Sequence, residues 1–350
     1  MIGCMRCTLA RRSFLQLGAM TLAASAAGPA LAQSARAGII DFHTHMITPD
    51  LPVNLLPSMR SLKLEQWLQA MREPRLHIEH MERVGVGSHV VSFGNATQGI
   101  SWGDAQHDLR VVRGINDRIA RDWVARNPGR FHGAATLPTQ DVKLAIGELE
   151  RAVTTLGFRV LQISSNTVDG IYYGDPRMDP LWRAIEALDV TVFVHPHGQE
   201  NAPPLDQFSL ANSVGQGIAE LKVMTSIIYN GVFEKFPKVK IVVAHGGGFL
   251  PHYYGRLDRN AAERPETGKN LKKLPSEYLK SFYFDSCVYS PAIMAALIEI
   301  VGVERIVLGG DVPVGEPDPV AALRRTPGLT PAQFDMITRE TPSRLLAQRA

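Results

Sequence analysis

The chain has 350 residues, of which 45% are hydrophobic and 20% charged, a composition typical of soluble globular proteins. The formal net charge of +3 comes from residues 1–32, which contain three arginines and no acid; the remainder has 34 basic and 34 acidic residues. This balance offers nothing to attract nucleic acid, and we expect no nucleic-acid partner. Cys287 is the one cysteine after residue 32, which excludes an intramolecular disulfide there.

The first 32 residues have the pattern of an export signal. Arg11 and Arg12 precede a mildly apolar run, residues 17–32, which ends in Ala-Leu-Ala. Paired arginines before such a run and a small-x-small ending resemble a twin-arginine signal. We therefore predict that residues 1–32 are removed after Ala32 and that the protein reaches the periplasm. The run is too short to cross a bilayer, so no stable membrane span is expected after cleavage. An uncleaved anchor is the alternative.

Eight short β-like runs follow, and several are continuously apolar rather than alternating. Such runs are typical of strands that are buried on both faces of a parallel sheet. They cover residues 38–42, 88–93, 131–137, 159–164, 191–194, 240–244, 282–285 and 305–308. Stretches with helical spacing of apolar residues separate them, for example residues 108–126 and 141–156. This rhythm predicts an α/β fold, a (β/α)8 TIM barrel formed by residues 39–350 as a single domain with loop insertions.

Three connections are longer than the rest. Residues 46–75 follow the first strand and residues 196–219 the fifth, so both leave the carboxyl end of the barrel, where active sites form. Residues 258–280 form a third, charged insertion rich in Lys and Pro. A solvated loop and a role in dimerisation are both open for this segment.

Metal-competent side chains lie at the ends of four predicted strands. His43 and His45 are placed just beyond the first strand, and residues two apart in an extended segment point the same way. His195 ends the fifth strand, His245 the sixth and Asp311 the eighth. Because these ends share one face of a barrel, we predict that the side chains converge on one divalent cation. The alternative is that they are separate core or capping residues.

The remaining histidines receive simpler interpretations. His77 and His80 lie beside acidic residues on a predicted helix, and we expect both to be solvated. His197 follows His195 at the same spacing as the first pair. We predict that His197 lines the substrate pocket, with a ligand role as the alternative.

Several motifs together resemble the amidohydrolase-2 branch of the amidohydrolase superfamily, and within it the aminocarboxymuconate-semialdehyde decarboxylases. The resemblance covers about residues 39–346. Its markers are Asp-Phe-His-Thr-His at 41–45, Gly-Phe at 157–158, Val-His-Pro at 194–196, Gly-Val-Phe-Glu-Lys-Phe-Pro at 231–237, His-Gly-Gly-Gly at 245–248, Gly-Arg-Leu-Asp at 255–258 and Gly-Asp at 310–311. One departure is Gly-Gly-Asp-Val-Pro at 309–313, where the family usually has Gly-Ser/Thr-Asp-Tyr-Pro.

The resemblance implies a site with one metal ion and assigns roles to particular residues. The implied ligands are His43, His45, His195 and Asp311. His245 is implied as the acid–base residue beside them. Arg256 is implied to bind a substrate carboxylate across the interface of a homodimer; a salt bridge to Asp258 or another acid within the chain is the alternative. Three imidazoles and one carboxylate favour zinc, and they also suit manganese, iron or cobalt.

The expected activity is that of a metal-dependent decarboxylase, a carbon–carbon lyase acting on an unsaturated or aromatic carboxylic acid. His245 or Asp311 would deliver the proton. No lysine ends the fourth strand, where two-metal members of the superfamily often have one. A hydrolase or hydratase, lactonase-like, is the alternative. A metal-binding or solute-binding barrel without activity is a third hypothesis, and an acid–base histidine beside the ligands argues against it.

Overall fold

The computed structural model describes residues 38–49, 61–94, 101–196, 205 and 207–347. Residues 39–350 form one compact unit, and residues 1–32, predicted as an export signal, lie outside the described residues. No helix in the described part has the length and apolar character needed to cross a bilayer.

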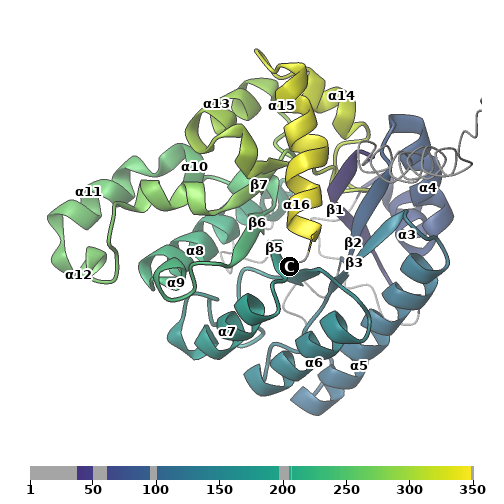
Figure 1. The fold of residues 1–350 in the computed structure, drawn as a ribbon, viewed down its shortest axis with the longest axis horizontal. Coiled ribbons are helices and arrows are strands. Elements are labelled where there is room, and N and C mark those ends of the chain that lie inside the picture. Colours follow the sequence, from purple (N-terminus) through teal and green to yellow (C-terminus); the bar gives the residue numbers. More distant parts are fainter. Residues whose placement is uncertain (1–37, 50–60, 95–100, 197–204, 206, 348–350) are drawn as a thin grey trace, which may run out of the picture. The chain divides into compact units, whose positions relative to one another are not determined.

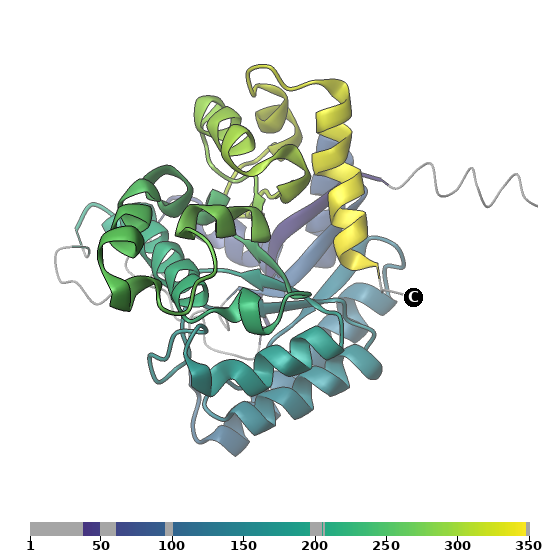
Figure 2. The ribbon, with the colours of Figure 1, turned by 60° about the vertical axis from the view of Figure 1, so that its left-hand side comes forward.

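Eight parallel strands form the centre of this unit, and they pair in sequence order (Figures 1 and 2). They are β1 (Ile40–Met46), β2 (Ser88–Phe93), β3 (Phe131–Ala135), β4 (Val160–Ile163), β5 (Thr191–Val194), β6 (Lys240–Val243), β7 (Tyr283–Asp285) and β8 (Ile306–Val307). The barrel closes where the Phe42 amide donates to the Leu308 carbonyl at 2.8 Å and Thr44 bridges to Val312. The predicted (β/α)8 barrel is therefore confirmed, and every predicted strand overlaps an observed one.

Helices surround the strands on the outside (Figure 2). They are α3 (Leu64–Arg72), α4 (Pro74–Val84), α5 (Ala105–Arg118), α6 (Val142–Thr154), α7 (Asp179–Ala187), α8 (Gln216–Tyr229), α9 (Val232–Lys235), α10 (Leu250–Tyr253), α11 (Gly255–Glu263), α12 (Pro265–Gly268), α13 (Pro291–Val301), α14 (Pro319–Arg324), α15 (Pro331–Asp335) and α16 (Thr341–Leu346). Short 3₁₀ or π segments are η3 (Ile119–Ala125), η4 (Pro176–Met178), η6 (Ala211–Gly215), η7 (His245–Gly247), η8 (Pro275–Ser281), η9 (Val303–Arg305) and η10 (Met336–Glu340). Asp104, Asp141 and Ser290 begin α5, α6 and α13 because each side chain accepts a backbone N–H three residues later.

Two hydrophobic cores follow from this arrangement. The larger one lies between the strands and the helices. The smaller one fills the barrel with Ile40, Phe42, Val90, Ala134, Val160, Phe193, Val242, Ala244 and Val307. Leu345 of α16 belongs to this inner core, and its carbonyl accepts a hydrogen bond from the Thr191 hydroxyl at 2.7 Å. The C-terminal helix therefore closes the amino end of the barrel, and the carboxyl end remains for the site.

A β-bulge in β1 changes which side chains face the barrel interior. The register with β2 shifts between Asp41 and Thr44, so that one extra residue is inserted. Without the bulge, Phe42 and His43 would point to opposite faces of the strand. Phe42 belongs to the inner core, yet His43 and His45 face inward as well. Both histidines lie inside β1, and the prediction that they follow its end is wrong.

The third insertion is mostly helical, so it is not the irregular loop that was one of its two open interpretations. It contains most of α11, all of α12 and nearly all of η8, and Figure 1 shows α11 and α12 extending away from the barrel. No residue of α11 is buried. A partner surface therefore remains an open role for this segment.

The expectation that His77 is solvated is also wrong. His77 is 1% exposed, because it shares the buried face of α4 with Met81 and Val84. Its Nδ1 lies 3.1 Å from Nδ1 of His89, and its ring packs edge-on against Trp123. Burial lowers the pKa of His77 to about 3 and holds the pKa of His89 well below its usual range. Helical periodicity, rather than the acidic neighbours, determines the position of His77.

The buried neutral His77 makes the fold sensitive to acid. Its folded pKa of about 3 is below the unfolded value of 6.5, so stability is complete above pH 6.5 and is lost as the pH falls towards 3. For metal-free protein we expect this residue alone to reduce the free energy of unfolding by about 2 kcal/mol between pH 7.5 and pH 5. Urea unfolding of the His77→Gln variant should show a shallower acid dependence. The exposed His107→Gln variant is the control, and equal slopes in all three proteins would contradict this account.

Candidate metal centre

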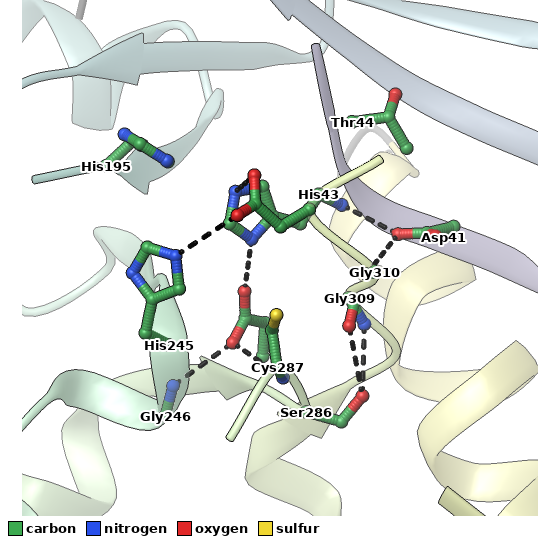
Figure 3. Close-up of polar contacts among 12 residues, drawn as sticks. Asp41, His43, Thr44, His195, His245, Gly246, Ser286, Cys287, Gly309 and Gly310 are labelled. Atoms are coloured by element: carbon green, nitrogen blue, oxygen red, sulfur yellow. Dashed lines mark hydrogen bonds and ion pairs between the residues drawn. The ribbon is translucent and has the colours of Figure 1, made fainter. Parts of the chain in front are cut away.

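The predicted metal-competent residues gather at the carboxyl end of the barrel (Figure 3). One ligand atom each from His43, His195, His245 and Asp311 lies within 4.8 Å of the others. His45 joins them, since its Nε2 lies 3.1 Å from Nε2 of His43 and 3.0 Å from Oδ1 of Asp311. The same Oδ1 is 3.2 Å from Nε2 of His43. Strands far apart in sequence thus supply one cluster of five side chains.

Each imidazole is anchored through its outer nitrogen, Nδ1. His43 Nδ1 contacts Asp285 Oδ2 at 2.6 Å, and His195 Nδ1 contacts the Pro196 carbonyl at 3.1 Å. His45 Nδ1 lies 3.1 Å from the Ser92 hydroxyl, which already donates to the Thr44 carbonyl and so must accept from the ring. In the neutral rings these acceptors fix the proton on Nδ1. His43, His45 and His195 therefore present an Nε2 lone pair.

This arrangement fits a divalent cation. The lone pairs of His43 and His45 point towards each other and towards Asp311 Oδ1, which is buried and has no hydrogen-bond donor. Such atoms repel one another unless a positive charge lies among them. The three atoms are 3.0–3.2 Å apart. When four ligand atoms surround an ion as a tetrahedron with bonds of 2.0–2.1 Å, neighbouring ligand atoms are about 3.3 Å apart, which is close to these separations. His43, His45, His195 and Asp311 would hold such an ion.

His245 is anchored in the same way but lies further from the other groups. Its Nδ1 contacts Glu220 Oε1 at 2.7 Å, and its Nε2 is 3.7 Å from Asp311 Oδ2. Burial lowers the pKa of His245, but Glu220 and Asp311 outweigh this and raise it well above its usual value. Burial raises the pKa of Asp311, yet His43, His245 and His45 together hold it well below its usual range. In the absence of a metal ion, His245 therefore holds its proton while it faces the Asp311 carboxylate.

The residues that position the histidines were not identified from the sequence. Asp285 ends β7 as Asp311 follows β8, so the rule that located Asp311 could have located it too. Asp41, two residues before His43, has a different role: its Oδ1 accepts the amides of His43 and Gly310, both at 3.0 Å, and so supports the bulge backbone. Glu220 comes from the middle of α8, and no pattern in its helix distinguishes it from other helical glutamates.

The His-Gly-Gly-Gly segment brings the backbone close to Glu220. His245 and Asp311 have φ values of 49° and 53°, and Gly246, Gly247 and Gly248 are also positive. A Cβ on Gly248 would lie 2.4 Å from Glu220 Oε2. Only glycine at position 248 leaves room for the carboxylate that orients His245. Left-handed backbone at two non-glycine site residues indicates that the surrounding packing enforces their positions.

The cluster includes neither of the two predicted substrate-binding residues. Arg256 is exposed on α11 and forms no ion pair with another described residue. Asp258, the suggested partner, accepts the Ser276 amide at 2.8 Å instead. His197 lies outside the described residues.

We expect Asp285 to determine metal affinity through His43. In the Asp285→Asn variant the side-chain oxygen would keep accepting the amides of Gly246 and Cys287, which Asp285 Oδ1 accepts at 3.1 Å. The NH2 group would then face the N–H of His43, so the ring would move or its proton would shift to Nε2, the metal-binding nitrogen. Loss of such a partner typically reduces metal affinity 10–100-fold. A chelator competition, with metal content measured by plasma mass spectrometry, should give one ion per wild-type chain and this loss in the variant. Asp175→Asn, an exposed carboxylate paired with Arg177, is the control. Unchanged affinity in Asp285→Asn would contradict the arrangement.

Comparison with known proteins places this geometry in a family. The sequence profile of the amidohydrolase family, Amidohydro_2, matches residues 40–347. A 2-amino-3-carboxymuconate-6-semialdehyde decarboxylase from Dictyostelium discoideum is 32% identical over 242 residues, which are 69% of this chain and 67% of that protein. The structure of 5-carboxyvanillate decarboxylase from Sphingomonas paucimobilis has a TM-score of 0.79 and 25% identity, and the match covers 89% and 99% of the two chains.

A dihydroxybenzoic acid decarboxylase from Polaromonas, solved with bound manganese and 2-nitroresorcinol, shares the fold with a TM-score of 0.76 at 24% identity. That match covers 88% of this chain and 96% of the other. The resemblance inferred from the motifs is therefore confirmed: the chain belongs to the amidohydrolase family, in the branch that contains these decarboxylases.

Proposed function

We propose that the protein is a metal-dependent decarboxylase of an aromatic or unsaturated carboxylic acid. The observation that carries this proposal is the His245 ring, anchored to Glu220 and directed at Asp311 beside three further imidazoles. A site that only stores a metal needs no proton donor next to the ligands. The three related proteins described above are named decarboxylases, which supports the same chemistry. A 2-keto-4-carboxy-3-hexenedioate hydratase from Sphingobium is also similar, at 27% identity over 218 residues, and it supports the hydratase alternative.

The groups at the site have complementary tasks in this reaction. A bound divalent cation would polarise the substrate's carboxylate or an adjacent oxygen. The Nε2 proton of His245 moves to the carbon that bears the carboxylate. The bond to the carboxylate then breaks, carbon dioxide leaves, and the electron pair of that bond returns to the conjugated system. His245 is favoured over Asp311 as the donor because Asp311 stays ionised.

The proposed ion is zinc, which three imidazoles and one carboxylate suit well. Manganese is the first competitor, because it is present in the Polaromonas structure. Iron and cobalt fit the same ligands. The metal content of the native protein, rather than of reloaded protein, decides among them.

In a homodimer, Arg256 is proposed to bind the carboxylate of a substrate that occupies the site of the neighbouring subunit. It is exposed, has no acidic partner among the described residues, and belongs to a helix without buried residues. A guanidinium binds a carboxylate in two-pronged fashion. For the N-terminal segment the proposal remains export and cleavage after Ala32; a full-length N-terminus on the periplasmic protein would rule out cleavage.

Carbon dioxide release is the direct test of the reaction. We expect metal-loaded protein to release it from at least one of 2,6-dihydroxybenzoate, 5-carboxyvanillate and 2-amino-3-carboxymuconate semialdehyde. His245→Asn should keep its metal and lose at least a hundredfold in kcat. In Glu220→Gln the neutral amide no longer stabilises the protonated ring, so the loss of activity towards alkaline pH should begin at a lower pH. Ring opening or water addition without carbon dioxide would replace this proposal with a hydrolase or hydratase.

Mixed dimers test the placement of Arg256. We expect Arg256→Ala and Asp311→Asn to be inactive alone, and their mixture after subunit exchange to regain up to a quarter of wild-type activity, because one site per mixed dimer has both residues. Light scattering confirms the dimer, and Arg259→Ala, one turn away in α11, is the control. No regained activity in a proven mixed dimer would place Arg256 in its own subunit's site or outside catalysis.

A further inference from the structure

A cavity lies at the end of the barrel opposite the metal centre. Its volume is about 350 Å³. Lys240 begins β6, Tyr283 begins β7 and Arg305 directly precedes β8, so the cavity opens at the amino ends of these strands. Elements α9 and η8 form its other walls. The volume falls in the range of small-molecule sites.

The lining is strongly basic. Five cationic side chains and one carboxylate contribute to it: Lys238, Lys240, Lys273, Lys280, Arg305 and Glu234. The carboxylate is already bound, because Glu234 contacts Nζ of Lys272 at 2.6 Å and the hydroxyl of Tyr278 at 2.5 Å. Its charge acts on Lys272, which is outside the lining, and on Lys273, so it offsets only part of the positive charge around the cavity.

Three of these cations form no close ion pair, although Lys273 is within the electrostatic influence of Glu234. Lys240 is paired with Asp189 at 3.0 Å. Lys273, Lys280 and Arg305 form no ion pair within the described part of the chain, although Lys273 donates to the Glu277 carbonyl at 3.3 Å. Like charges around one concave surface raise the potential there and attract an anion.

Of these three cations, Arg305 has the surroundings most typical of an anion-binding residue. It is half-buried, and its guanidinium lies over the Tyr283 ring with 4.9 Å between the carbon and the ring centre. Its Nε is buried and has no hydrogen-bond acceptor. Leaving a buried donor without an acceptor is unfavourable. A guanidinium stacked on a ring at the wall of the cavity is suited to an oxyanion.

We propose that this cavity binds a small oxyanion, a phosphate or carboxylate group on a free metabolite, separately from the metal centre. Arg305 donates to the oxyanion through its guanidinium, and Lys280 and Lys273 supply neutralising charge. The site is independent of the proposed reaction, because it lies at the opposite end of the barrel and shares no residue with the metal centre.

Calorimetric titration of the metal-loaded full chain tests this site, with inorganic phosphate and succinate as separate probes at constant ionic strength. We expect at least one probe to bind. The Lys280→Gln/Arg305→Gln variant should bind it at least tenfold more weakly. Lys143→Gln/Arg83→Gln, which removes the same charge from exposed positions elsewhere, should bind it normally. The probe that binds identifies the ligand as phosphate-like or carboxylate-like.

Binding at the metal must be separated from binding in the cavity. The Asp311→Asn variant, which loses a predicted metal ligand, should retain the cavity signal. Three outcomes would overturn the proposal: neither probe binds, the pocket variant binds as wild type does, or the signal disappears in Asp311→Asn. The titrations measure binding and do not depend on the proposed activity. If the protein is a decarboxylase, carbon dioxide release by the Lys280→Gln/Arg305→Gln variant should be unchanged when no probe is added.

Discussion

The structure depends on the close approach of electron-rich atoms at one end of a barrel with an apolar interior. Nε2 of His43, Nε2 of His45 and Oδ1 of Asp311 lie 3.0–3.2 Å from one another. Hydrogen bonds at Nδ1 of His43 and His45 hold the two rings, so that neither ring can turn its Nε2 lone pair away. Only a positive charge reconciles the three atoms. Without an ion a proton does so: burial lowers the pKa of His43, but Asp311 and Asp285 raise it to about 9.

The barrel provides this approach through local departures from regular structure. The bulge in β1 allows Phe42 to fill the core while the next residue, His43, also faces inward. His245 and Asp311 adopt left-handed backbone conformations that non-glycine residues avoid. Hydrogen bonds accompany two of these departures: Asp41 accepts the His43 amide at the bulge, and Glu220 accepts from the His245 ring. The regular strands thus support irregular backbone at the carboxyl end of the barrel, where the cluster lies.

The sequence predicted the strands and the convergence of the metal-competent residues, because both follow from one rule: apolar runs that end in polar residues share a barrel face. It did not reveal contacts between side chains distant in sequence. Glu220 reaches His245 from a helix whose other residues give no sign of a site. His77 was misplaced because acidic neighbours suggested solvent, whereas its helical position directs it to the core. The bulge in β1 could not be predicted either, because it is defined by the pairing of β1 with another strand.

The first and last strands of the barrel both supply the cluster. His43 lies in β1 and Asp311 follows β8, so an ion held between them would join the two ends of the folded domain. Such a cross-link closes a loop that includes nearly every other element, and long loops lose the most conformational freedom when they are closed. A nascent chain cannot form the complete ligand set until its last strand has left the ribosome. Metal acquisition would therefore report that all eight strands of the barrel have been made.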